Sequence, residues 1–206
     1  MAAKDNESKK KIQLTALNLI SQDGCESVTI NQICKEANIS KNTFYYYFAS
    51  KDDLLLSFYE LPDERISASI ANIFAADNCI EQYWMTVAPL LDFITEGGSE
   101  IMKYMAHAHA NYRKAEKEPP NPNHLNFSEI RTAIIKRGQS AGEMRNVFDP
   151  FSLQVIAQAQ FFGLVSMWGT TDGKFNLAEA ARLALELLLD VKPELRQADE
   201  NALLNA

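Results

Sequence analysis

The spacing of the apolar residues is the feature that most constrains this chain. Apolar side chains recur every three or four positions almost from end to end, which is the period of an α-helix with one buried face. Runs that alternate strictly between apolar and polar residues, which would indicate strands, are few. The chain has 206 residues, of which 47% are apolar, so it can bury a sizeable core. The sequence therefore predicts an all-α fold of one domain or two small ones.

Several classes of protein are disfavoured by composition. No window of about 18 apolar residues is present, and the first eleven residues are polar and rich in lysine. We therefore expect a protein that neither spans a membrane nor is secreted. The three cysteines, Cys25, Cys34 and Cys79, are odd in number and lack C-x-x-C spacing, so we expect buried thiols in a reducing cytoplasm.

Charge is distributed unevenly along the chain. Residues 1–50 carry six lysines and five acidic residues, whereas the remainder carries 14 basic and 22 acidic residues, which gives the net charge of −7. Phosphates respond to charge near the contact surface rather than to the total, so an acidic chain with this start can still bind DNA. The imbalance is small enough to be noise, and charge alone does not decide the question. The acidic excess after residue 50 favours cationic or neutral small molecules over anionic ones.

The first quarter of the chain predicts three short helices. An amphipathic helix over 9–22 is followed by Gly24 as a stop, and Thr29 begins a helix of about two turns. Asn38 tolerates the left-handed conformation that a tight turn needs, and Ser40 is a strong N-cap for a helix over 41–48.

The rest of the chain predicts longer helices. The run from Ser50 to Asp53 resembles a capping box with Asp in place of Glu, and it opens the first of them. We predict a DNA-binding domain over 1–50 and a second domain over 51–206, joined by the helix over 50–76, in which Pro62 makes a kink. The tail over 192–206 is polar and is expected to fray. The further predicted helices span 79–95, 98–117, 124–141, 149–171 and 175–191.

The two short helices and their turn match a helix-turn-helix unit. Phe44 and Phe48 are spaced to anchor the second helix from behind. The residues expected near its outward face offer ammonium, amide, hydroxyl and phenol groups to phosphates and base edges: Lys41, Asn42, Thr43, Tyr45 and Tyr46.

These residues, from Gly24 through the aromatic run 44–48 to the Ser50-Lys51-Asp52-Asp53-Leu54 helix start, resemble the DNA-binding domain of TetR-type transcriptional regulators. The resemblance covers about residues 9–57, with Asn38 where the family usually has Gly and Asn42 where a small residue is common. It implies an all-helical homodimer of about nine helices, with a C-terminal domain that binds a small-molecule effector and thereby releases operator DNA. It assigns phosphate contacts to Thr29, Ser40, Tyr45 and Lys51, and base contacts to Lys41, Asn42, Tyr46 and, more weakly, Asn31. For Tyr47 we favour a place in the core.

The larger domain contains both tryptophans and many other large apolar side chains. At helical spacing these residues usually form a packed core, although an apolar pocket would use the same side chains. The candidate pocket residues are Trp84, Tyr104, Met105, His107, His109, Phe161 and Trp168. His107 and His109 lie about 200° apart around a helix, so together they cannot bind one metal ion, and no cofactor or metal is predicted.

Two C-terminal helices, over 151–168 and 177–191, are apolar on more than one face. We expect them to pair with their copies in a four-helix dimer interface. Candidate interface residues are Phe162, Val165, Leu183 and Leu187.

Two other functions compete with a ligand-controlled DNA-binding regulator. A helical di-iron enzyme would need Glu-x-x-His pairs, and the chain has none, nor does it carry a nucleophile elbow, a P-loop or an H-E-x-x-H motif. No catalytic residue is therefore predicted. A helical adaptor that uses the motif only for packing would leave Lys41, Asn42 and Tyr45 without a role.

Overall fold

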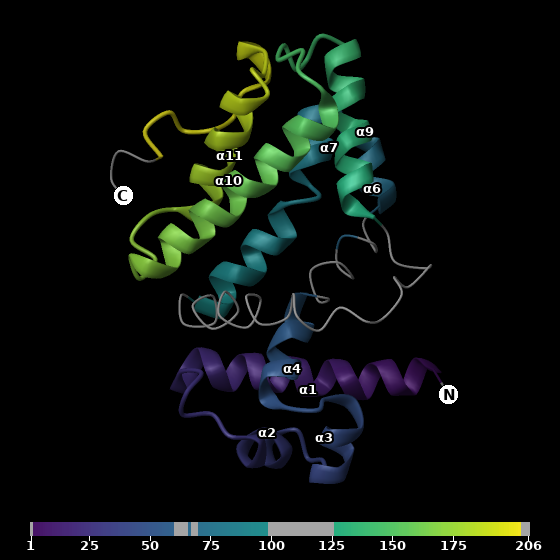
Figure 1. The fold of residues 1–206 in the computed structure, drawn as a ribbon, viewed down its shortest axis with the longest axis vertical. Helices are drawn as coiled ribbons and strands as arrows, with labels where there is room; N and C mark the ends of the chain where they lie inside the picture. Colours follow the sequence, from purple (N-terminus) through teal and green to yellow (C-terminus); the bar gives the residue numbers. More distant parts are fainter. Residues whose placement is uncertain (1, 60–65, 67–69, 99–125, 203–206) are drawn as a thin grey trace. The chain divides into compact units, whose positions relative to one another are not determined.

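The computed structural model describes residues 2–59, 66, 70–98 and 126–202. The secondary structure of these residues is all-helical, with no β-strand beyond one isolated bridge, as predicted (Figure 1). The chain divides into two compact units. The first comprises 1–61 and 94–117, and the second comprises 62–93 and 118–206. Within the described ranges, no helix is both long enough and apolar enough to cross a membrane.

Four helices and a 3₁₀ turn make up the start of the first unit. They are α1 (Ala2–Asp23), α2 (Ile30–Glu36), α3 (Lys41–Tyr47), α4 (Lys51–Leu56) and η1 (Ser57–Tyr59). Helix α1 contacts α2, and α2 contacts α3 (Figure 1). The apolar residues fully buried in this region come from every one of these elements: Ile12, Ala16, Ile33, Phe44, Leu54, Leu55 and Phe58.

Side-chain caps fix where these short helices begin. Thr29 forms a reciprocal capping box with Gln32, and the Ser40 side chain accepts from the backbone N–H of Thr43. Ser50 accepts from the N–H of Asp53, whose carboxylate in turn accepts from the N–H of Ala49 at 2.8 Å. The predicted caps at Thr29, Ser40 and Ser50 are thus confirmed.

The turn between α2 and α3 is closed by hydrogen bonds of the Schellman type. Asn38 has φ of +51°, the N–H of Ile39 donates to the carbonyl of Cys34 at 2.9 Å, and the N–H of Asn38 donates to Lys35 at 3.2 Å. Asn is among the few residues other than Gly that adopt this conformation readily. The prediction of a left-handed Asn38 is confirmed, and it sets the direction in which α3 leaves the turn.

The second unit packs helices against α10 (Pro150–Thr170). Helices α9 (Phe127–Ser140) and α11 (Leu177–Leu188) both contact α10, and α7 (Cys79–Trp84) contacts α9 and α6 (Ile70–Ala75) (Figure 1). One core cluster joins α7, α9, α10 and α11 through buried side chains that include Ile80, Tyr83, Ile134, Ile135, Leu153, Leu185 and Leu189.

Two predicted helices differ from the structure. The predicted helix over 79–95 is broken, because α7 ends at Trp84, turn residues follow, and a new helix runs over 88–98. Pro89 explains the break, since its ring would clash with the carbonyl of Met85 in a continuous helix. Within the helix predicted over 50–76, the described residues are α-helical over Lys51–Leu56, at Ile66 and over Ile70–Ala75, with the 3₁₀ turn η1 directly after Leu56. Pro62 and most of the helix predicted over 98–117 lie outside the described residues.

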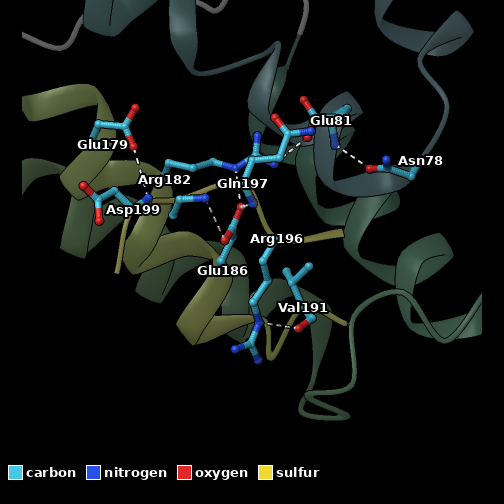
Figure 2. Close-up of polar contacts among 10 residues, drawn as sticks. Asn78, Glu81, Glu179, Arg182, Glu186, Val191, Arg196, Gln197 and Asp199 are labelled. Carbon is cyan, nitrogen blue, oxygen red and sulfur yellow. Dashed lines mark hydrogen bonds and ion pairs between the residues drawn. The ribbon is translucent and has the colours of Figure 1, made fainter. Parts of the chain in front are cut away.

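The expectation that the tail frays from residue 192 is wrong for residues 192–202, the part of the tail that the structure describes. Val191 pairs with Met144, and η2 (Pro193–Leu195) follows. Glu186, whose side chain is 2% exposed, accepts from the backbone N–H of Gln197 at 2.9 Å and of Ala198 at 3.3 Å (Figure 2). The C-terminal segment is therefore tied to α11 by a buried carboxylate.

Candidate DNA interface and effector cavity

Helix α3 presents one buried and one exposed face. Phe44 and Phe48 are 0% and 1% exposed, and their rings lie 5.7 Å apart beneath the helix. Tyr45 and Tyr46 are 53% and 71% exposed. Lys41 and Asn42 are also exposed, whereas Thr43 and Tyr47 are half-buried. Four of the five residues predicted for the outward face of the helix are therefore exposed, and Thr43 is half-buried.

Hydroxyl groups stand at the starts of α2 and α3, where backbone N–H groups are exposed. The Ser40 hydroxyl lies 2.8 Å from that of Thr43. The Thr29 hydroxyl donates to the side-chain carbonyl of Gln32, also at 2.8 Å. Asn31 is exposed on the first turn of α2. A phosphate oxygen is most readily held at such helix starts, which supports the positions predicted for Thr29 and Ser40.

Lys51 has a contact that the sequence did not indicate. Its side chain is half-buried, and its ammonium group donates to the backbone carbonyl of Cys25 in the turn after α1. The ammonium thus joins the start of α4 to the start of the helix-turn-helix. An ammonium has three donors, so this contact is compatible with the predicted phosphate contact.

A cavity lies in the second unit between α7, the turn after it, α9, α10 and α11. Aromatic and aliphatic side chains form most of its wall, among them Trp84, Val87, Leu90, Phe161 and Leu185. The polar lining comes from Tyr83, Arg131, Gln154, Gln158 and Gln160. Such an apolar recess with a few polar groups is the usual form of a small-molecule site.

Two hydrogen-bonded pairs organise the polar part of the wall. The Tyr83 hydroxyl donates to the side-chain carbonyl of Gln154 at 2.7 Å. Burial raises the pKa of Tyr83 to about 12, so the phenol keeps its proton at neutral pH. The Arg131 guanidinium donates through Nε to the Thr86 hydroxyl at 2.9 Å and through Nη2 to the Thr86 carbonyl at 2.6 Å.

The cavity includes some of the pocket residues proposed from the sequence. Trp84 and Phe161 line it. Trp168 does not, because its indole N–H donates to the carbonyl of Phe175 at 3.1 Å in a buried packing contact. Tyr104, Met105, His107 and His109 lie outside the described residues.

None of the five polar lining residues was among the pocket residues proposed from the sequence: Tyr83, Arg131, Gln154, Gln158 and Gln160. The sequence feature that could have indicated a polar site was Gln154, because a long amide side chain is unusual at a buried position of a helix as apolar as α10.

The proposed interface residues have different surroundings. Phe162 and Leu187 are 44% and 63% exposed, and Leu183 is half-buried. Val165 is only 4% exposed within one chain. Like Leu153 and Ala157 on the same helix it is buried, and so it offers little surface to a partner.

Comparison with known proteins bears on this geometry. The family model described as bacterial regulatory proteins, tetR family, matches residues 12–58. The uncharacterized HTH-type transcriptional regulator YuxN of Bacillus subtilis (strain 168) is 43% identical over 67 residues, which is 32% of this chain and 23% of YuxN. The chain thus spans less than a quarter of the length of the first curated relatives it matches.

Solved structures share the whole fold. A structure described as the molecular basis for control of antibiotic production by bacterial hormones has a TM-score of 0.65 at 17% identity, and it covers 88% of this chain and 95% of its own. FadR from Bacillus subtilis in complex with stearoyl-CoA has a TM-score of 0.54 at 23% identity, with 87% and 97% covered.

The fold and the exposed second helix define an N-terminal helix-turn-helix domain. The match over 12–58 identifies this segment as similar to the DNA-binding domain of the tetR family of bacterial regulatory proteins.

Proposed function

We propose that the protein is a ligand-responsive repressor that binds a palindromic operator as a homodimer and is released by a small molecule. The observation that carries this proposal is α3, whose polar residues are exposed while Phe44 and Phe48 are buried behind them. We assign DNA binding to residues 1–50 and effector binding and dimerisation to 51–206. Such a protein acts on the DNA of the cytoplasm and is not an enzyme.

The DNA contacts are tested by mobility shift with a duplex selected from a randomised pool. We expect affinity to fall with salt at a log–log slope of about −0.9 per phosphate neutralised. Lys41→Ala should lower the ratio of specific to random affinity about tenfold, because a base contact contributes about 1–3 kcal/mol of discrimination. Lys51→Ala should weaken both duplexes alike.

Circular dichroism of both variants controls for folding, which matters for Lys51 because it also bonds Cys25. Equal affinity of the wild type for selected and random duplexes would contradict sequence-specific binding. It would favour the alternative function, a helical adaptor that uses the helix-turn-helix only for packing.

The dimer is supported by an apolar surface along α10 and α11. Phe151, Val155, Phe162 and Leu187 are 44–63% exposed. Nothing lies within 4 Å of where a Cβ on Gly163 would be, so the backbone there is open to close approach by another helix. Isologous pairing would cover this surface and place two copies of α3 on successive faces of a palindrome.

Leu187→Glu should weaken the dimer about 100-fold or more. The substitution enters a two-fold interface twice, and each copy buries an unpaired charge. Sedimentation velocity over a concentration series measures the effect. Leu14→Glu is the matched control, since Leu14 is 43% exposed on α1. A wild-type protein that sediments as a monomer at every concentration would refute the proposed dimer.

The cavity in the second unit is our candidate effector site. Its lining is apolar with a few placed polar groups, and every described lining residue belongs to that unit. FadR from Bacillus subtilis, which shares the fold, has been solved with stearoyl-CoA. That complex supports a small organic effector for this chain. A ligand releases DNA only in proportion to its preference for the released state over the bound state.

A further inference from the structure

We propose that the cavity binds an apolar molecule that carries a hydrogen-bond-accepting oxygen, and that the side-chain amide of Gln154 is the donor that anchors it. This inference rests on the proposed effector role of the cavity and adds the chemical class of its ligand. It concerns a residue pair, Gln154 and Tyr83, on α10 and α7.

Gln154 is buried yet only half satisfied. The residue is 1% exposed and lines the cavity. Its Oε1 accepts from the Tyr83 hydroxyl at 2.7 Å, and its Nε2 makes no hydrogen bond within the part of the chain that the structure describes. This nitrogen keeps some accessible surface and lines the cavity, so a molecule that enters can accept a hydrogen bond from it.

Tyr83 determines which end of the amide meets the cavity. Its hydroxyl is buried and donates to Oε1 of Gln154 at 2.7 Å. That hydrogen bond turns the NH₂ group of Gln154 the other way. The site thus presents N–H and selects a ligand that offers an acceptor such as a ketone, ether or hydroxyl oxygen.

The remaining wall selects the body of the ligand. Trp84, Val87, Phe161 and Leu185 contribute apolar surface. The Arg182 guanidinium lies 5.2 Å from the Trp84 ring centroid, and this cation–π contact helps to hold the ring in place. Preorganised aromatic walls favour a flat apolar molecule, and the single amide donor sets its orientation.

The test uses two probes that differ only at the acceptor. Acetophenone carries a carbonyl where ethylbenzene carries a methylene group, and ligand-observed NMR titrations measure both affinities. We expect the wild type to bind acetophenone about tenfold more tightly, although ethylbenzene is the more apolar. Gln154→Leu should retain ethylbenzene binding and remove the preference. Gln160→Leu, which changes an exposed amide at the same cavity, should keep it.

A second variant protects the test against misfolding. Tyr83→Phe keeps the ring but removes the hydroxyl that orients the amide, so acetophenone affinity should fall several-fold while ethylbenzene affinity is unchanged. Equal wild-type affinities for the two probes, binding of neither, or a preference that survives in Gln154→Leu would each overturn the proposal. Probe binding is measured without DNA. If the protein shows no sequence-specific DNA binding in the mobility shift but still prefers acetophenone, the proposed regulatory function would be refuted. The role of Gln154 as the donor to the ligand would stand.

Discussion

Replacing Arg182 with leucine is expected to lower the free energy of unfolding by about 3–5 kcal/mol, because it leaves a buried carboxylate without its counter-charge. Arg182 and Glu186 have side chains that are 6% and 2% exposed, and Arg182 Nε donates to Glu186 at 2.6 Å. The guanidinium also pairs with Glu81 on α7 (Figure 2). It lies 5.2 Å from the centroid of the Trp84 ring. Burial acts to lower the pKa of Arg182, but the hydrogen bonds and negative charges of Glu81 and Glu186 together outweigh it, so the pKa is raised.

An exposed ion pair provides the matched control. Arg145 and Asp190 are 2.5 Å apart, but both side chains are 47% exposed. Arg145→Leu should therefore cost no more than about 1 kcal/mol. Urea unfolding followed by tryptophan fluorescence compares the two, since Trp84 and Trp168 both lie in the second unit.

The double variant R182L/E186L separates loss of an ion pair from loss of packing. If the cost of Arg182→Leu is the stranded carboxylate, the double variant should recover part of the lost stability, less the contribution of the hydrogen bonds that Glu186 accepts from the backbone of Gln197 and Ala198. Equal destabilisation by Arg182→Leu and Arg145→Leu would show that the buried cluster contributes no more than a surface pair.

The cluster also relates the cavity to the C-terminal segment. Glu186 holds the backbone of Gln197 and Ala198, and Glu179 accepts from the N–H of Asp199 at 3.3 Å (Figure 2). Through Arg182 the same carboxylate is one contact away from Trp84, a wall of the cavity. The segment after α11 is therefore connected through this cluster to the wall of the candidate effector cavity.

Local signals made the first unit predictable. A capping hydroxyl, a left-handed Asn38 and a pair of phenylalanines four residues apart act within a few positions of themselves, so reading them needs no knowledge of the fold. The same holds for Pro89, whose effect on the preceding turn is local and was overlooked.

Long-range partners explain what the sequence could not predict. Tyr83 and Gln154 are 71 positions apart, and Arg182 and Glu81 are 101 apart. The tail looked unstructured because its polar residues carry no periodic pattern. Its order comes from a buried carboxylate on α11 that accepts backbone N–H groups, and such a contact leaves no mark on the spacing of side chains.

Phe44→Ala is expected to destabilise the first unit by about 3–5 kcal/mol and to abolish DNA binding. Phe44 is 0% exposed, and its ring packs at 5.5 Å from Tyr45 and 5.7 Å from Phe48. Truncating a fully buried Phe removes its transfer free energy and leaves a cavity under α3. Far-UV circular dichroism reports helices of both units, whereas tryptophan fluorescence follows only the second. The dichroism transition should therefore shift to lower urea while the fluorescence transition stays in place.

Asn42→Ala is the companion variant, because Asn42 lies on the exposed face of the same helix. Its stability should change by no more than about 0.5 kcal/mol, while its affinity for the selected duplex falls about tenfold or more. Comparing Phe44→Ala with Asn42→Ala distinguishes residues that hold α3 in place from residues that contact the bases. If Asn42→Ala bound the selected duplex as the wild type does, Asn42 would not be a base contact. If Phe44→Ala left both transitions unchanged, the buried face of α3 would not be what holds the helix in place.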